Sequence, residues 1–393
     1  MLSSQTIEIV KSTAPLIARI GPALAAHFYE RMFLHHPELK DIFNMSNQFT
    51  RAQHEALFHA VYSYAAHIDN LEVLLPIVEK IAQKHTNFNI TPTMYAIVGE
   101  NLLASIAEML SSEQTVLNAW TEAYHVLAQI FINREEEIYR EVESTDGGWR
   151  GTRQFMLVSK IKESDLITSF IFAPIDDKPV TCYKPGQYIG IYLHPEQFEY
   201  QEIRQYSLSS APNIKTYRIS VKRHPQGIVS RYLHNHLNVG DTVKLAPPSG
   251  DFFLDVNKKT PIALISGGIG LTPMLSMLES IVNTHDADIH WLHAAENSQH
   301  HAFGDDINHL IQQNPRVKRG IWYNKPLISD KNFDYYGFID LSLVEGLTSH
   351  PARQFYLCGP INFMQATVQQ LVCAGITKDN IHYECFGPHK MIN

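Results

Sequence analysis

The sequence has few cysteines and no long apolar run. Only four cysteines occur among 393 residues, and none forms a CxxC pair, which argues against a disulfide scaffold or a cysteine zinc site. No apolar stretch approaches the roughly 18 residues of a membrane-spanning helix, and the first residues lack the charged-then-apolar plan of a signal peptide. We therefore expect a cytoplasmic protein with reduced thiols and no transmembrane segment.

An excess of positive charge is also missing. The formal net charge is -8, and residues 1–143 alone carry 9 basic and 17 acidic side chains, so all of the net acidity lies in the first third of the chain. Such a surface repels nucleic acid, so we expect no nucleic-acid partner. Nothing in the sequence indicates an obligate protein partner.

Hydrophobic periodicity divides the chain into a helical part and a β-rich part. Up to Glu143, apolar residues recur at spacings of three and four, which predicts helices, and the STDGG sequence at 144–148 breaks this pattern. Six short strand-like segments follow, and after them comes a strand, a glycine turn and a helix. We predict an all-α domain over 1–143, an antiparallel β-barrel over 150–255 and an α/β domain over 256–393. The predicted barrel strands are 155–161, 167–173, 188–193, 204–209, 217–221 and 242–246.

Three predicted helices carry one polar side chain on an apolar face. The helix Leu71–His85 ends its apolar stripe in His85, and a helix over 47–68 carries Gln53 in a similar position. A helix beginning at Pro22 carries Tyr29 among apolar neighbours. From the residues alone, a satisfied core histidine, an exposed helix end and a core tyrosine explain these positions as well as a ligand-binding set does.

The strongest local motif is a glycine turn between a strand and a helix. The strand 261–266 is followed by GGIGLTP at 267–273, in which we expect Thr272 to cap the helix and Pro273 to be its first residue. A helix N-terminus of this kind can receive a phosphate group. The motif is not GxGxxG, so alone it is a weak indication of nucleotide binding.

The segments HFYERMF, HPELKDIFNMSNQ, KIAQKH and FINREEEIY resemble the globin domain of bacterial flavohaemoglobins over its whole length. The resemblance implies a haem b site with His85 as the iron ligand. It implies distal roles for Tyr29 and Gln53, proximal roles for Tyr95 and Glu137, and haem contacts from Phe43, Leu57 and Lys84. From the residues alone, Glu137 belongs to an acidic run typical of a solvated helix face.

The later motifs resemble the ferredoxin-reductase superfamily, whose RxYS signature is similar to RQYS at 204–207. The resemblance implies FAD contacts from Tyr188, Arg204, Gln205, Tyr206, Ser207 and Ser230. It implies binding of NADH or NADPH by Gly268, Ile269, Gly270, Leu271, Thr272, Pro273, Cys358, Gly359 and Pro360. Further cofactor contacts are implied for Glu384, Cys385, Phe386 and Gly387, with Phe386 near the flavin. Leu271 departs from the family pattern, where some relatives carry a polar residue.

The two resemblances together imply an all-α globin joined to a ferredoxin-reductase-type module. The resemblances imply the conversion of nitric oxide and oxygen to nitrate. The two modules complement each other, because a flavin can accept hydride and pass single electrons to haem. Two alternatives stay open: an oxygen-binding or sensing globin with a haem-reducing domain, and a general NAD(P)H-dependent ferric or quinone reductase. Glu296, which follows the apolar strand at 289–293, favours NADH over NADPH.

Overall fold

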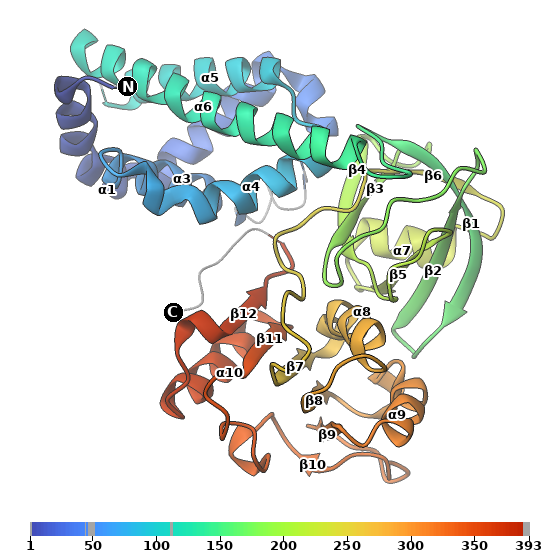
Figure 1. Ribbon diagram of the computed structural model, residues 1–393. Coiled ribbons are helices and arrows are strands. Elements are labelled where there is room, and N and C mark those ends of the chain that lie inside the picture. Colours follow the sequence, from blue (N-terminus) through green and yellow to red (C-terminus); the bar gives the residue numbers. More distant parts are fainter. Residues whose placement is uncertain (1, 44, 46–51, 111–112, 388–393) are drawn as a thin grey trace. The chain divides into compact units, whose positions relative to one another are not determined.

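The computed structural model describes residues 2–43, 45, 52–110 and 113–387, without the side chains of residues 52 and 53 (Figure 1). The chain divides into two compact units. One consists of Met1–Thr152 and Gly190–Arg204, and the other of Arg153–Ile189 and Gln205–Asn393. Within the described residues, no helix combines the length and the apolarity needed to cross a membrane.

The first unit is built mainly from helices that bury a shared apolar core. They are α1 (Ser4–His35), η1 (Pro37–Asp41), α3 (Ala52–Ala66), η2 (Leu71–Leu74), α4 (Leu75–Asn87), α5 (Pro92–Leu110) and α6 (Gln114–Glu143). Large side chains such as Phe28, Met32 and Ile106 are fully buried in this core. Burial of one face of each helix stabilises the bundle more than helix propensity does.

Helix α1 begins at Ser4, so the predicted start at Pro22 was wrong. A proline inside a helix removes a backbone hydrogen bond and costs about 3 kcal/mol, yet α1 contains both Pro15 and Pro22. Buried residues at helical spacing continue on both sides of the prolines, from Val10 to Phe28. Burial of this long stripe outweighs the two lost hydrogen bonds, and the helix continues.

A closed antiparallel barrel follows the helices in the chain, and most of its residues belong to the second unit, while Gly190–Arg204, with most of β3 and part of β4, is counted with the first. Its strands are β1 (Arg153–Lys162), β2 (Ile167–Pro174), β3 (Tyr188–Leu193), β4 (Glu202–Ser207), β5 (Tyr217–Lys222) and β6 (Thr242–Leu245), in the order β4-β3-β6-β1-β2-β5. A bridge between Leu208 and Ile219 joins the end of β4 to β5 and closes the sheet. Helix α7 (Ile228–Asn235) lies beside the barrel (Figure 1). The six predicted strands are confirmed to within two residues.

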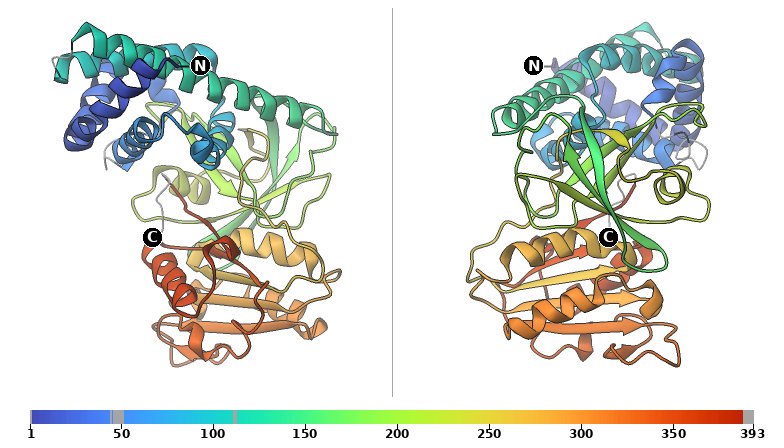
Figure 2. Two further views of the ribbon diagram at one scale, coloured as in Figure 1. Left: turned by 60° about the vertical axis from the view of Figure 1, so that its left-hand side comes forward. Right: turned by 90° about the vertical axis from the view of Figure 1, so that its right-hand side faces the viewer.

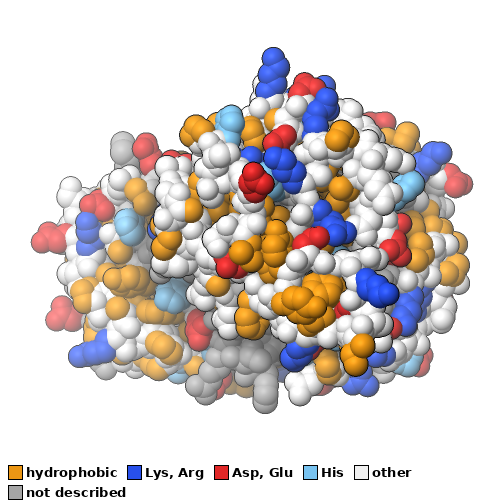
Figure 3. All heavy atoms as spheres, turned by 90° about the horizontal axis from the view of Figure 1, so that it is seen from below, with side chains coloured by type: hydrophobic (Ala, Val, Ile, Leu, Met, Phe, Trp, Pro, Cys, Tyr) orange, Lys and Arg blue, Asp and Glu red, His pale blue; other side chains and the backbone are white. Residues whose placement is uncertain are grey.

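A parallel sheet follows the barrel in the chain. Its strands are β7 (Ile262–Gly267), β8 (Ile289–Ala295), β9 (Val317–Tyr323), β10 (Tyr335–Tyr336), β11 (Gln354–Cys358) and β12 (Ile381–Glu384), in the order β10-β9-β8-β7-β11-β12. Helices α8 (Leu271–Ile281) and α9 (Gly304–Gln313) cover one face, and α10 (Ile361–Cys373) covers the other (Figure 2). On the face shown in Figure 3, basic and acidic side chains are interspersed with apolar ones.

Candidate functional site

In the helical unit, two polar side chains hold His85. His85 lies in the last turn of α4, where its Nδ1 is 2.8 Å from Tyr95 Oη and 2.8 Å from Glu135 Oε1. The Tyr95 hydroxyl itself donates to Glu135 Oε1, so Nδ1–H of His85 donates to both oxygens. Nδ1 therefore carries the proton, and Nε2 keeps its lone pair for a metal.

The carboxylate beside His85 is Glu135, so the prediction of Glu137 was wrong. Glu135 is 3% exposed, whereas the side chain of Glu137 is 65% exposed and pairs with Arg134 at 3.0 Å. Side chains two positions apart on a helix point in directions that differ by about 200°, so only one of Glu135 and Glu137 can face the core. A signal was present in the sequence: Phe131 and Ile138, four residues before and three after Glu135, are apolar and buried.

The predicted distal residue Tyr29 is buried among aromatic rings. Its ring stacks on His54 with a centroid distance of 4.9 Å and meets the edge of Phe43 at 5.8 Å. Leu57 and Lys84 are partly buried, and Leu57 packs against the helical core. The side chain of Gln53 lies outside the described residues. His54 was not predicted, although its aromatic ring one residue after Gln53 was visible in the sequence.

The helix that carries His85 is also fixed at its end. Asn87, two residues after His85, is fully buried, and its carbonyl oxygen accepts a hydrogen bond of 2.8 Å from Tyr192 Oη. Gly190 leaves room for this contact, because a Cβ there would lie 2.3 Å from Asn87 Oδ1. The segment Gly190–Arg204 thus packs within the helical unit and braces the last turn of α4.

The glycine turn after β7 is shaped by close backbone approach. Gly268 has a φ of +54°, and a Cβ on Gly270 would lie 2.1 Å from the carbonyl oxygen of Cys358. Gly268–Gly270 form a 3-10 turn and α8 begins at Leu271, so the predictions of Thr272 as the helix cap and of Pro273 as the first helical residue were wrong. The Thr272 hydroxyl instead donates to the carbonyl of Ile269 at 3.1 Å, which closes the turn.

Three cofactor segments predicted from the sequence meet at the carboxyl edge of the parallel sheet. Cys358 on β11 is in register with Ser266 on β7 and with Glu384 on β12. The glycine turn, the turn Cys358–Pro360 and the segment Glu384–Gly387 therefore leave the sheet at the same edge, where open α/β sheets bind ligands. Burial raises the pKa of the Cys358 thiol well above its usual value, so it is a neutral thiol. The side chain of Phe386 is 47% exposed.

Tyr188, a residue of the predicted flavin set, is buried. Burial, reinforced by the charges of Glu384 and Asp251, raises the pKa of its hydroxyl well above 10.0, so it is a neutral phenol. Gly250 has a φ of +119°, and a Cβ there would lie 2.8 Å from the Tyr188 ring. Neither Gly250 nor Asp251 belongs to a motif that would have singled it out in the sequence.

The other predicted flavin residues lie on β4 and at the start of α7. Arg204 forms an ion pair of 2.7 Å with Glu202 on the same strand, while Ser207 is buried and Gln205 and Tyr206 are partly buried. Ser230 lies in the first turn of α7, and its hydroxyl accepts a hydrogen bond from the His224 amide at 3.1 Å.

Glu296 follows β8 and is not a lone carboxylate. It pairs with Lys325 Nζ at 2.8 Å and with His300 Nδ1 at 3.1 Å. The Lys325 ammonium offsets part of the repulsion that Glu296 would exert on a 2'-phosphate. The expected preference for NADH therefore stays a prediction.

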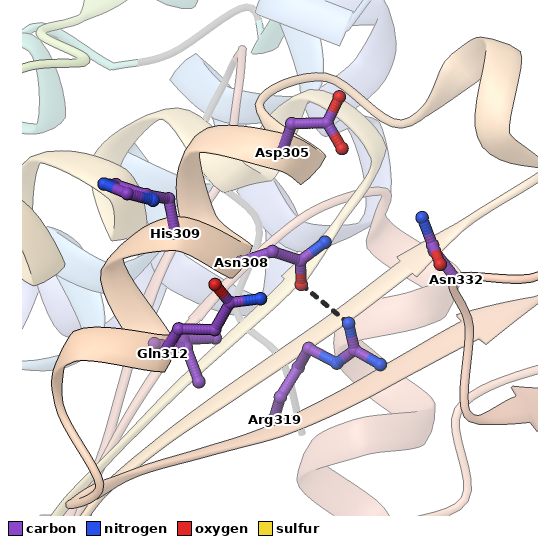
Figure 4. A pocket seen from close by; sticks show the side chains of 7 residues that line it. Asp305, Asn308, His309, Gln312, Arg319 and Asn332 are labelled. Carbon is purple, nitrogen blue, oxygen red and sulfur yellow. Dashed lines mark hydrogen bonds between the residues drawn. The ribbon is translucent and has the colours of Figure 1, made fainter.

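A polar hollow of about 460 Å³ lies between α9 and the segment around Asn332 (Figure 4). Arg319 donates to Asn308 Oδ1 across it at 2.6 Å. Its lining contains none of the site residues predicted from the sequence: it consists of Asp305, Asn308, His309, Ile311, Gln312, Arg319 and Asn332.

Each of the three parts of the chain matches a known protein family. A globin family model matches residues 26–131, a model for an oxidoreductase FAD-binding domain matches 154–254, and a model for an oxidoreductase NAD-binding domain matches 264–369. A flavohaemoglobin from Malassezia yamatoensis with bound FAD and haem is 26% identical, with a TM-score of 0.87, over 98% of this chain and 100% of that one. The FAD- and NAD-binding domain of nitric oxide dioxygenase from Vibrio cholerae is 42% identical, with a TM-score of 0.56, over 62% of this chain and 100% of that one. The chain belongs to the flavohaemoglobin family.

The reductase part of this flavohaemoglobin has wider structural relatives. The cytochrome b5 reductase domain of Ulva prolifera nitrate reductase is 26% identical, with a TM-score of 0.53, over 60% of this chain and 97% of that one. The predicted fold class, an all-α globin followed by an antiparallel barrel and a ferredoxin-reductase-type α/β domain, is confirmed.

The residues of this flavohaemoglobin fit the cofactors of its domains. The bonds at Nδ1 of His85 leave Nε2 as the ring nitrogen for haem iron. The close approach of Gly270 to Cys358 leaves backbone rather than side chains at the carboxyl edge, which suits a dinucleotide. Gly250 likewise lets Tyr188 pack at the predicted flavin site.

Proposed function

We propose that this flavohaemoglobin is a nitric oxide dioxygenase, which uses NADH or NADPH to convert nitric oxide and oxygen to nitrate. The observation that carries the proposal is the bonding of His85 Nδ1 to both Tyr95 Oη and Glu135 Oε1. The relative from Vibrio cholerae, whose described domain belongs to a nitric oxide dioxygenase, supports it further.

Glu135 gives the histidine more electron-donating character. A buried carboxylate that accepts a hydrogen bond from Nδ1–H gives the imidazole partial imidazolate character. This raises the basicity of Nε2. Burial, with the charge of Glu135 as the second cause, raises the pKa of Tyr95 far above its usual value, so its hydroxyl keeps its proton and keeps donating. With haem bound, a strongly donating His85 would favour reaction with oxygen over simple storage.

Tyr29 supplies the polar group on the other side of the proposed haem. Its burial among Phe43, His54 and Phe33 fixes the ring, so its hydroxyl has a defined position. A fixed hydroxyl can stabilise negative charge that develops on oxygen during the reaction. When bound, haem would supply the oxygen-activating metal, and FAD would convert hydride into single electrons.

A pair of matched substitutions tests the proposal. Glu135→Gln removes the charge that holds His85, and we expect nitric oxide consumption to fall about 10- to 100-fold, the usual effect of losing an outer partner of a metal ligand. Glu137→Gln, the same change two residues away on the exposed face, should leave the rate unchanged. The measurements are the nitric oxide consumption rate with NADH and oxygen, and the iron–histidine stretching frequency of the ferrous protein.

The outcomes separate the three candidate functions. Loss of nitrate formation together with a lower stretching frequency in Glu135→Gln supports the dioxygenase. Wild-type protein that releases oxygen reversibly and forms no nitrate above a His85→Ala control would be an oxygen-binding globin. Full NADH turnover with ferric or quinone acceptors in His85→Ala, without nitrate formation by the wild type, would indicate a general reductase.

A further inference from the structure

Helix α8 is bonded at both ends to segments that serve the reductase site. Its N-terminal end follows the glycine turn Gly268–Gly270, which lies at the carboxyl edge of the sheet. Near its other end, Glu279 accepts two hydrogen bonds of 2.8 Å. Its Oε1 accepts one from the Arg218 guanidinium, and its Oε2 accepts the other from the backbone amide of Ala211. Ser276 Oγ also donates to the carbonyl of Ser210 at 2.7 Å.

The partners of Glu279 continue directly from the flavin strand. Strand β4 ends at Ser207, and the loop residues Ser209 to Ala211 begin two positions later. Arg218 on β5 donates both to the Ser209 carbonyl and to Glu279, so it links the loop to the helix. The Ser210 carbonyl accepts a second hydroxyl, from Tyr183, at 2.6 Å. This clamp, defined by Arg218, Ser276 and Glu279, therefore joins the dinucleotide helix to the strand predicted to hold the flavin.

The clamp is separate from the contacts that hold α8 on its own sheet. Met274 and Leu278 are fully buried in the core beneath the helix, whereas the side chains of Arg218 and Glu279 are 21% and 26% exposed. Loss of the clamp should thus leave α8 folded on the parallel sheet. What would change is the placement of the helix against the barrel.

We propose that Arg218 and Glu279 are positioning residues for hydride transfer, which fix the dinucleotide helix against the flavin strand. The proposal rests on the oxidoreductase role of the FAD- and NAD-binding domains and not on nitric oxide as the substrate. Hydride moves from the nicotinamide ring of NADH to the flavin, leaving NAD⁺ and reduced flavin. The reacting atoms must approach to about 3–3.5 Å, and a shift of about 1 Å can cost about 100-fold in rate.

The chain offers a matched control for this pair. Asp334 accepts a hydrogen bond of 2.8 Å from Arg319 and one of 2.9 Å from the amide of Ile321. Like Glu279, it therefore bonds one arginine and one backbone amide. The side chains of Arg319 and Asp334 are 26% and 31% exposed, close to the values for the clamp. Arg319 lines the hollow of Figure 4, and none of the predicted site residues lines it. Asp334→Ala therefore measures the effect of losing an equivalent ion pair.

The test combines rapid mixing with hydrogen exchange on the FAD-loaded full chain. We expect Glu279→Ala to lower the maximal rate of flavin reduction by NADH about 10- to 100-fold, while the Kd for NADH stays nearly unchanged. Amides of residues 208–211 should exchange faster in this variant without dinucleotide. Glu279→Gln, which can still accept from the Ala211 amide, should recover most of the rate and the protection.

Wild-type reduction and exchange rates in Glu279→Ala would overturn the proposal. An equal loss of rate in Asp334→Ala would overturn it as well, because the effect would then be one of general stability. The exchange measurement needs no hydride transfer, so it judges the clamp independently. A wild-type flavin that neither NADH nor NADPH reduces would count against the oxidoreductase role instead.

Discussion

At the scale of single residues, two glycines allow a backbone effect to be separated from a steric one. Gly250 and Gly240 have φ values of +119° and +99°. A Cβ on Gly250 would meet the ring of Tyr188, whereas a Cβ on Gly240 would have no atom within 4 Å. Alanine at either position should lower the free energy of unfolding by about 1–3 kcal/mol through backbone strain. Only Gly250→Ala should also displace Tyr188 and weaken FAD binding, by about 10-fold or about 1.4 kcal/mol.

Titration of the flavin-free protein with FAD, together with urea unfolding, measures both effects. The Gly240→Ala variant is the control, since it should lose stability and keep its FAD affinity. Equal FAD affinities in the two variants would show that Tyr188 does not position the flavin.

Residue identities at the haem site were predictable only in part. His85 and Tyr95 were named correctly as partners, because the sequence segments around them carry the family resemblance. Glu135 was missed because three consecutive glutamates look alike when only their order is considered. The face of the helix decides among them, and it could have been read from the apolar residues Phe131 and Ile138. The roles of the remaining site residues are still predictions.

At the level of secondary-structure elements, strand β8 holds two buried histidines and the segment after it holds a partly buried one, and together they make the sheet sensitive to acid. Burial lowers the pKa of His290 and of His301 to about 4, and lowers that of His293 well below 6.5. The unfolded chain takes up a proton on each near pH 6.5 and the folded chain does not, so stability falls as the pH drops from about 6.5 toward 4. Each histidine should cost up to about 1.4 kcal/mol per pH unit.

The change in unfolding free energy between pH 7 and pH 5 tests this account. We expect His301→Gln, whose amide can still bond Tyr323, to have a shallower pH dependence than the wild type, by about one proton. His309→Gln, on the exposed face of α9, is the control and should keep the wild-type slope. The same slope in all three proteins would mean that His301 is not buried in its neutral form.

The elements differ in how well local sequence predicted them. The barrel strands were predicted closely, since alternating side chains and turn residues mark both ends of each strand. Helix α1 was predicted too short because Pro15 and Pro22 are local breaking signals. The burial that overrides them comes from other helices of the unit, and no local pattern contains that information.

At the scale of the whole molecule, the change from helical to alternating periodicity was enough to predict a helical part followed by a β-rich part. The assignment of Gly190–Arg204 to the helical unit was not predictable. It depends on long-range contacts such as that of Tyr192 with Asn87, more than 100 residues apart in sequence. A local sequence pattern does not record such contacts.

If the protein is a nitric oxide dioxygenase, as we propose, both atoms of oxygen enter nitrate. The most direct measurement is the mass of nitrate formed from nitric oxide and ¹⁸O₂ by the wild-type protein with NADH, with His85→Ala as the control. We expect nitrate that carries both ¹⁸O atoms from O₂, and none above background in His85→Ala. Nitrate without both labelled atoms, or equal nitrate from the variant, would contradict it.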